Sequence, residues 1–158
     1  TRVLKGHIAV VVTKINKGIK GKNLDIKARN WLKKINLDYP HGTGHGVGYF
    51  LNVHEGPQAI SKSNKITLKK GMILSNEPGF YKKNKFGIRI ENLICVKKNK
   101  KGIFFNNLTL APIEKDLINF KLLNQKEKTY LKNYNKLIFN NLKNYLSYRE
   151  KRWLQDLF

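Results

Sequence analysis

The sequence contains little cysteine, little arginine and few acidic residues, and it has no long apolar run. Its single cysteine, Cys95, cannot form a disulfide within the chain, which favours a reduced, cytoplasmic setting. No apolar segment approaches the roughly 20 residues that a helix needs to cross a bilayer, so no transmembrane segment is predicted. The first residues are already amphipathic and no cleavage site follows an apolar core, so no signal peptide is expected.

The shortage of acidic residues leaves the chain strongly basic. It has 32 lysines and arginines against 10 aspartates and glutamates, which gives a formal net charge of +22. Such a charge can support nucleic-acid binding by counterion release. Here, however, 27 of the basic residues are lysines spread along the whole chain, and 19 asparagines accompany them. That composition is typical of solvated positions encoded by an AT-rich genome. Because no nucleic-acid motif is present, we expect no nucleic-acid or membrane partner.

The apolar spacing predicts an α+β chain of about one domain's size. With 158 residues, of which 41% are hydrophobic, the chain is large enough to bury a core. The predicted helices cover 3–15, 24–35 with Asn23 as N-cap, 130–145 and 148–158, and the predicted strands cover 50–53, 72–77, 86–96 and 103–110. A polar connection is expected over 58–70. Short turns between strands favour an antiparallel sheet with the N-terminal helices on one face. His7 falls on the apolar stripe of the first helix and is interpreted as a packed histidine.

Three of the four histidines lie close together and alternate with glycines. His41, His45 and His54 fall within fourteen residues, and glycines stand at 42, 44, 46 and 48. The glycines disfavour a helix and favour a loop or strand whose backbone passes close to something bulky or charged. The spacing is not His-Glu-x-x-His, which excludes a thermolysin-type zinc helix. Neither Cys95 nor any serine has a sequence context that favours a catalytic nucleophile.

Two glutamates lie in strand-like segments that could end near these histidines. Glu77 ends an apolar strand just before Pro78, where burying an unpaired carboxylate is costly. Glu91 shares a strand face with Arg89, so it is either an ion-pair partner of Arg89 or a metal ligand that Arg89 orients. One histidine with two glutamates suits manganese, cobalt or zinc. We therefore predict that His45, Glu77 and Glu91 bind metal.

These motifs are similar to those of a known family. The segments concerned are His41-Gly-Thr-Gly-His45-Gly-Val-Gly, Asn52-Val-His54-Glu-Gly-Pro, Glu77-Pro-Gly and Gly87-Ile-Arg89-Ile-Glu91-Asn92. They resemble aminopeptidase P (Xaa-Pro aminopeptidase), a family of the pita-bread metallopeptidases (M24) that include methionine aminopeptidase and prolidase. The resemblance runs nearly end to end. It implies the second half of a pita-bread catalytic domain over 1–98, and a C-terminal extension over 99–158 that serves packing or dimerisation.

The resemblance also implies a function and roles for individual residues. It implies removal of the N-terminal residue from Xaa-Pro peptides at a centre of two divalent ions, usually manganese, in a homodimer. His45, Glu77 and Glu91 match metal ligands, and Arg89 matches the arginine that supports the last of them. Glu77 would also relay a proton, His54 would stabilise the developing oxyanion, and His41 would help to hold the substrate.

The sequence departs from the family in its aspartates. The family has five protein ligands, of which the first two are aspartates on a hairpin well upstream of the metal histidine. Asp25 and Asp38 precede His45 but do not match that spacing. We therefore expect a C-terminal fragment without the two aspartate ligands, which by itself self-associates, binds metal weakly and has little peptidase activity. The alternative is a non-catalytic pita-bread relative that acts by binding a partner.

Overall fold

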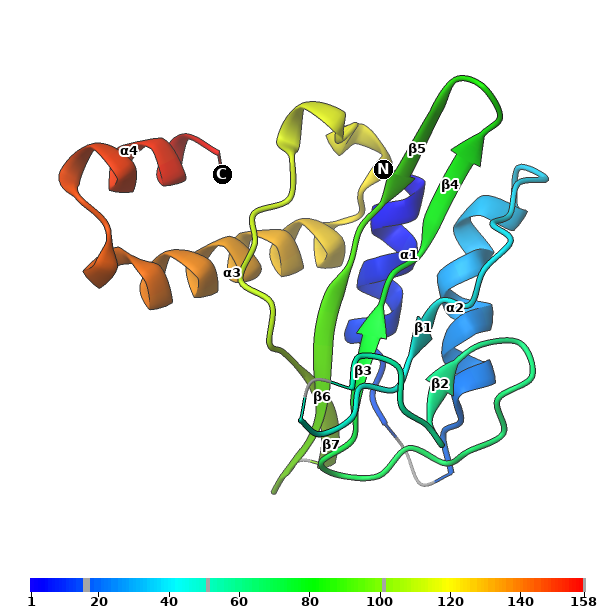
Figure 1. Cartoon of the computed structure of the whole chain (residues 1–158). Helices are drawn as coiled ribbons and strands as arrows, with labels where there is room; N and C mark the ends of the chain where they lie inside the picture. Colours follow the sequence, from blue (N-terminus) through cyan, green and yellow to red (C-terminus); the bar gives the residue numbers. More distant parts are fainter. Residues whose placement is uncertain (16–17, 51, 101, 158) are drawn as a thin grey trace. The chain divides into compact units, whose positions relative to one another are not determined.

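A computed structural model describes residues 1–15, 18–50, 52–100 and 102–157, and the parts of the predictions above that fall on 16–17, 51, 101 and 158 lie outside the described residues. The chain forms two compact units. One comprises Arg2–Thr109 and the other comprises Leu110–Phe158 together with Thr1. Each unit is described by itself below, and the elements of both are drawn in Figure 1.

The first unit combines two helices with short antiparallel strands, as the α+β prediction required. Its helices and strands are α1 (Arg2–Val11), α2 (Gly21–Lys33), β1 (Gly44–His45), β2 (Ala59–Ile60), β3 (Ile73–Asn76), β4 (Gly79–Lys82), β5 (Phe86–Arg89), β6 (Asn92–Asn99) and β7 (Gly102–Asn107). The strand order β3-β6-β7 makes the largest sheet, and α1 packs on β3 and β7. The other two sheets pair β1 with β2 and β4 with β5.

The two helices cross closely because α1 carries a glycine at the contact. A Cβ atom on Gly6 would lie 2.3 Å from the Ala28 carbonyl oxygen of α2, so any larger residue would push the helices apart. Helix α1 ends at Val11, whereas the sequence predicted that it would continue to Ile15. The β-branched run that ends in Thr13 disfavours the helix, and Ile15 instead donates its N–H to Ile103 of β7.

Helix α2 begins two residues before the predicted N-cap. The N-cap residue is Lys20, so the prediction of Asn23 as N-cap was wrong. Asn23 lies at the third helical position, where its Oδ1 atom accepts the hydrogen bond of the Lys20 N–H at 3.0 Å.

The central feature of the first unit is a long hairpin that is interrupted on both arms. β3 pairs with β6, with Leu74 opposite Ile94, and β4 pairs with β5 in the same antiparallel sense. Between the two ladders, Glu77-Pro78 interrupts one arm and Ile90-Glu91 interrupts the other. Pro78 has no N–H to give to a ladder. The predicted strand 86–96 is therefore two strands, β5 and β6. The chain does not leave the hairpin at Pro78 as predicted, because β4 begins at the next residue, Gly79.

Two further local predictions were wrong. The described residues of the predicted strand 50–53 form no strand, and Phe50 has a φ of 54°. The supposed polar connection 58–70 contains β2, which pairs with β1. Strand β2 was missed because a two-residue strand is set by its pairing partner and leaves no alternation to detect.

The buried histidine of α1 ties the helix to the hairpin, as its packed position predicted. His7 is fully buried, with its Nδ1 atom 3.1 Å from the Asn76 carbonyl oxygen. Asn76 in turn donates from its side-chain amide to the His7 carbonyl oxygen at 3.0 Å. Asn76 directly precedes Glu77, so α1 fixes the backbone where the first hairpin arm is interrupted.

The second unit is helical. After the 3-10 turns η1 (Lys115–Leu117) and η2 (Phe120–Leu122), it contains α3 (Gln125–Leu142), η3 (Lys143–Tyr145) and α4 (Tyr148–Asp156). Tyr134, Ile138 and Leu154 form its buried core. The helix predicted over 130–145 thus corresponds to α3, whose Tyr134 and Ile138 are buried, whereas Tyr145 lies after α3 and is exposed. Among the described residues of both units, no helix is long and apolar enough to cross a membrane.

Acid should destabilise the first unit through His7. Burial lowers the pKa of His7 to about 4, and the backbone groups of Ile90 and Asn76 offset only part of this effect. An unfolded histidine has a pKa of about 6.5. The unfolded state therefore takes up the proton first, and this contribution to stability is lost as the pH falls from about 6.5 through about 4. We expect His7→Gln to remove about 2–3 kcal/mol of the stability difference between pH 7 and pH 4.5.

Urea unfolding at the two pH values measures this difference. Asn30→Gln is the control, because Asn30 is exposed and the substitution changes no titratable group. Equal pH dependence in the His7→Gln variant and the unsubstituted chain would contradict the assignment.

Candidate metal centre

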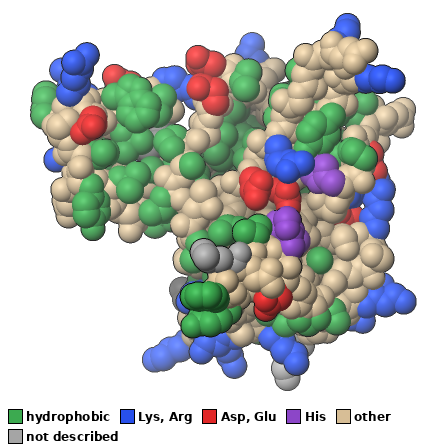
Figure 2. All heavy atoms as spheres, viewed as in Figure 1, with side chains coloured by type: hydrophobic (Ala, Val, Ile, Leu, Met, Phe, Trp, Pro, Cys, Tyr) green, Lys and Arg blue, Asp and Glu red, His purple; other side chains and the backbone are tan. Residues whose placement is uncertain are grey.

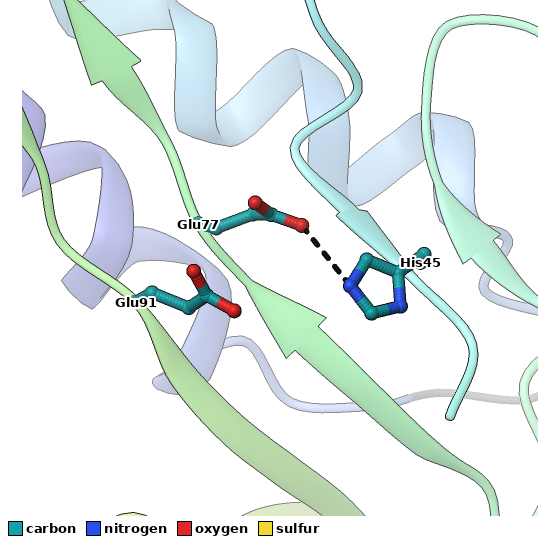
Figure 3. A group of neighbouring side chains, drawn as sticks. All are labelled: His45, Glu77 and Glu91. Atoms are coloured by element: carbon teal, nitrogen blue, oxygen red, sulfur yellow. Dashed lines mark ion pairs between the residues drawn. The ribbon is translucent and has the colours of Figure 1, made fainter. Parts of the chain in front are cut away.

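Three side chains from separate strand segments point into one small space. His45 belongs to β1, Glu77 follows β3, and Glu91 precedes β6 (Figure 3). Each offers one ligand atom, and these atoms all lie within 4.8 Å of one another. Glu77 is buried, His45 is partly buried and Glu91 is exposed, so the cluster is open to solvent at Glu91. Figure 2 shows histidine, acidic and basic side chains gathered on one face of the first unit.

Both oxygens of the buried Glu77 carboxylate have a partner, and so does the backbone N–H of Glu77. The Ser75 hydroxyl donates to Glu77 Oε1 at 2.8 Å, and Arg89 Nη1 lies 3.2 Å from Glu77 Oε2. The Glu77 N–H donates to the Thr43 carbonyl oxygen at 2.8 Å. Sequence reasoning missed Ser75. The available signal was its spacing of two residues from Glu77, since residues i and i+2 of a strand share a face.

The hydrogen bonds of His45 leave Nε2 as its ligand atom. The Nδ1 atom lies 3.0 Å from the Gly46 carbonyl oxygen. A carbonyl oxygen can only accept, so this bond assigns the ring hydrogen to Nδ1. Nε2 then presents a lone pair to Glu77 Oε1, 3.4 Å away. A metal ion bound between Nε2 and the carboxylate oxygen would be attracted by both atoms. The donor set therefore fits a divalent metal ion, and a backbone carbonyl on the other ring nitrogen is usual for metal-binding histidines.

Arg89 supports Glu77 rather than acting as a simple partner of Glu91. Its Nη1 atom makes the ion pair with Glu77, and its Nε atom donates to the Tyr81 hydroxyl oxygen at 2.8 Å. The hydrogen bond to Tyr81 is the main cause that raises the pKa of Arg89, with smaller contributions from Glu77 and Glu91. Arg89 therefore stays charged and fixes the orientation of the Glu77 carboxylate.

Tyr81 links Arg89 to His41. The Tyr81 hydroxyl lies 2.8 Å from His41 Nε2, and His41 Nδ1 lies 2.7 Å from the Gly42 carbonyl oxygen. Because Tyr81 accepts from Arg89, its own hydrogen is free to be donated to the lone pair of His41 Nε2. Sequence reasoning missed Tyr81. The residue type that accompanies it is the glycine at position 87, which lies opposite Tyr81 in the β4–β5 pair. A Cβ atom at Gly87 would come within 2.9 Å of the tyrosine ring.

His54 reaches the cluster from the loop after β1. Its ring centroid lies 4.1 Å from that of His45. The loop is closed by the Glu55 N–H, which donates to the Gly46 carbonyl oxygen at 2.9 Å. His54 itself is exposed. The structure thus brings together all six residues predicted for the site: His41, His45, His54, Glu77, Arg89 and Glu91.

The two aspartates upstream of His45 do not join the cluster. Asp25 Oδ2 accepts from Arg29 Nε at 2.8 Å, and Asp38 Oδ1 accepts from Arg29 Nη1 at 2.6 Å. Both carboxylates hold Arg29, in agreement with the expectation that they do not match the two aspartate ligands of the family. The described residues supply three candidate ligands to the cluster.

Models of known families match most of the chain. The model for metallopeptidase family M24 matches residues 1–98, and a model for the C-terminal region of peptidase M24 matches residues 102–157. Xaa-Pro aminopeptidase 1 of Dictyostelium discoideum is 47% identical over 147 residues, covering 87% of this chain and 23% of that protein. A probable Xaa-Pro aminopeptidase P of Laccaria bicolor is 48% identical over 145 residues, covering 85% of this chain and 23% of that protein. The chain thus spans about a quarter of the length of the curated relatives it matches.

Solved structures confirm the predicted fold. An X-prolyl aminopeptidase from Caenorhabditis elegans, described as a cytosolic enzyme with a di-nuclear active site, superimposes with a TM-score of 0.91 at 38% identity, over 99% of this chain and 27% of that chain. A prolidase from Pyrococcus furiosus superimposes with a TM-score of 0.59 at 34% identity, over 68% of this chain and 30% of that chain. The fold is therefore that of part of a pita-bread catalytic domain, followed by a helical extension.

Adding a methyl group at Gly44 should disturb the cluster. A Cβ atom there would lie 1.9 Å from the Ser75 carbonyl oxygen, whereas one on Gly42 would lie 3.6 Å from its nearest neighbour. We expect Gly44→Ala to lower the free energy of unfolding by about 1–3 kcal/mol, as overpacking does, because β1 must move away from β3. Gly42→Ala is the control and should change it by no more than about 0.5 kcal/mol. Urea unfolding compares the two variants, and equal losses would contradict the close approach of β1 to β3.

Proposed function

Since the chain belongs to metallopeptidase family M24, we propose that it supplies metal-binding and substrate-binding residues to an Xaa-Pro aminopeptidase, which removes the N-terminal residue from peptides with proline in second place. The observation that carries this proposal is the convergence of His45, the buried Glu77 and Glu91, whose ligand atoms all lie within 4.8 Å of one another. The names of the relatives, which are 47% and 48% identical to this chain, support the substrate class.

In this proposal the first unit contributes three of the ligands of a two-metal centre. His45, Glu77 and Glu91 would hold the ions, while Ser75 and Arg89 orient Glu77. Bound divalent ions supply Lewis-acid polarisation of the scissile carbonyl and lower the pKa of a water molecule. Residues 1–98 would form this half of the catalytic domain, and 99–158 would form the extension.

The remaining polar side chains have separate proposed roles in peptide cleavage. Glu77 accepts a proton from the attacking water and returns it to the imino nitrogen of the leaving proline. His54 donates a hydrogen bond to the carbonyl oxygen as negative charge develops there. His41 holds the substrate. The orientation of its ring is fixed by the hydrogen bond between His41 Nε2 and the Tyr81 hydroxyl, which are 2.8 Å apart.

We further propose the metal, the setting and the partners of the protein. An imidazole with two carboxylates suits manganese best, with zinc or cobalt as alternatives. The cytosolic relative supports a cytoplasmic setting. Exposed apolar side chains of the second unit, including Phe120 and Trp153, support a homodimer. Neither nucleic acid nor membrane is a proposed partner, and on the face drawn in Figure 2 the lysines and arginines lie in several separate places.

Manganese titration of this chain tests the ligand set. With one histidine and two glutamates we expect weak binding, without two tight sites, because two ions need more charge and more ligands. Glu77→Gln should abolish the binding heat, whereas Glu150→Gln, on the fully exposed α4 residue, should not change it. Two tight sites in isothermal titration would overturn the expectation of an incomplete centre.

Peptide cleavage by a chimaera tests the function. In the chimaera this chain replaces the matching segment of the Dictyostelium Xaa-Pro aminopeptidase 1. We expect manganese-dependent release of the N-terminal residue from an Xaa-Pro peptide, and a loss of about 100-fold or more in kcat on Glu77→Gln, since proton transfer is removed. Glu150→Gln in the same chimaera is the control. A folded chimaera that binds manganese but cleaves no Xaa-Pro peptide would favour the non-catalytic, partner-binding alternative.

A further inference from the structure

Arg29 of α2 is a buried cation beneath the histidine loop, the segment 38–43 that leads into β1. Its side chain is almost completely buried. It forms ion pairs with Asp25 at 2.8 Å and with Asp38 at 2.6 Å. A guanidinium can hold two carboxylates and still have N–H groups left for other acceptors.

The remaining donors of Arg29 hold the backbone of the histidine loop. Nη1 donates to the Tyr39 carbonyl oxygen at 2.8 Å, and Nη2 donates to the His41 carbonyl oxygen at 2.5 Å. The guanidinium carbon also lies 3.9 Å from the centroid of the Tyr39 ring. A buried carbonyl without a donor is costly, so the loop backbone depends on Arg29 for its conformation.

Two hydroxyl groups, those of Tyr39 and Thr43, extend the same network to the candidate metal site. Thr43 Oγ donates to Asp25 Oδ1 at 2.7 Å, so the Tyr39 hydroxyl, 2.5 Å from Thr43 Oγ, must be the donor in that contact. The Thr43 carbonyl oxygen accepts the Glu77 N–H at 2.8 Å. The network therefore ends on the backbone of His41 at one side and on the backbone of Glu77 at the other.

The charge on Arg29 is fixed. Burial alone would lower the pKa of Arg29, but hydrogen bonds to Asp25 and Asp38 outweigh burial and raise it. Burial likewise opposes ionisation of Asp38, yet its hydrogen bond with Arg29 lowers the pKa of that carboxyl. Arg29 therefore has no acid–base role. Its role is to hold the backbone of the histidine loop in place.

We propose that Arg29, together with Asp25 and Thr43, is a positioning element for the site: it fixes the histidine loop so that the His41 ring meets Tyr81 and the Glu77 backbone stays docked on Thr43. The effect of this positioning on catalysis rests on the proposed function. The effect on the position of His41 does not depend on that function, because the hydrogen bonds concerned lie within this chain.

Two pairs of variants separate positioning from simple stabilisation. Arg29→Lys keeps the charge but cannot bind two carboxylates and two carbonyls from one ammonium group. Its control is Arg2→Lys, since Arg2 also donates to a backbone carbonyl, that of Trp31 at 3.2 Å, but outside the loop. Thr43→Val removes the hydroxyl at constant shape, and Thr43→Ser restores it. The threonine pair decides the matter if Arg29→Lys does not fold.

The first measurement is made on this chain without metal. Proton–nitrogen correlation spectra of the histidine rings report which ring nitrogen carries the hydrogen. We expect His41 to be predominantly protonated on Nδ1 in the unsubstituted chain and in the Arg2→Lys and Thr43→Ser variants. In Arg29→Lys and Thr43→Val its signals should move toward the mixed-tautomer values of a solvated histidine. Unchanged His41 signals in both of these variants, with only a lower urea midpoint, would overturn the proposal.

The second measurement is made on the chimaera. We expect Arg29→Lys and Thr43→Val to lower kcat on an Xaa-Pro peptide by about 10- to 100-fold, the usual effect of losing a group that orients a ligand, while Arg2→Lys and Thr43→Ser retain it. A parallel decrease in all four variants would mean a structural role only. If the unsubstituted chimaera is inactive, the proposed function fails, and the His41 spectra still decide whether Arg29 positions the loop.

Discussion

The burial of the Glu77 carboxylate is the constraint on which the first unit is organised. A charge taken out of water must be satisfied by nearby donors, and here they come from three directions. Ser75 reaches it from the same strand, Arg89 from the opposite arm of the hairpin, and Thr43 holds its backbone from the loop before β1. Pro78 interrupts the pairing at this point, so the carboxylate lies in the gap between the two paired regions.

The gap in the hairpin gives the site its access. Glu77 on one arm and Glu91 on the other both fall where the ladders are interrupted, and β1 brings His45 alongside them (Figure 3). The register is the same on both sides of the interruption, with Asn76 opposite Asn92 and Gly79 opposite Arg89. Glu77 therefore lies opposite Glu91, and directly opposite residues of an antiparallel pair share a face. This register, together with the fixed backbones of Asn76 and Thr43, lets both carboxylates converge with the imidazole.

The scarcity of acidic residues makes their placement informative. Only five aspartates and glutamates occur in residues 1–98, and each has a specific role in the described structure. Glu77 and Glu91 belong to the cluster, and Glu55 accepts a hydrogen bond from Asn52 at 2.7 Å within the loop that carries His54. Asp25 and Asp38 hold Arg29 beneath the histidine loop. The lysines that dominate the net charge take no part in the cluster.

The sequence by itself determined the family, the α+β class and the residues of the cluster, because these depend on residue types at fixed short spacings. Glycines around His45 and a proline after Glu77 restrict the backbone locally, and local restrictions can be deduced without a structure. The helices and β3 were foreseen in outline for the same reason. Only the tertiary structure decided which partners these residues have. Tyr81, Ser75 and Arg29 have unremarkable local sequences, and their contacts join residues up to forty positions apart. The two-residue strands β1 and β2 likewise exist only because they pair, and no local pattern encodes a pairing between distant segments.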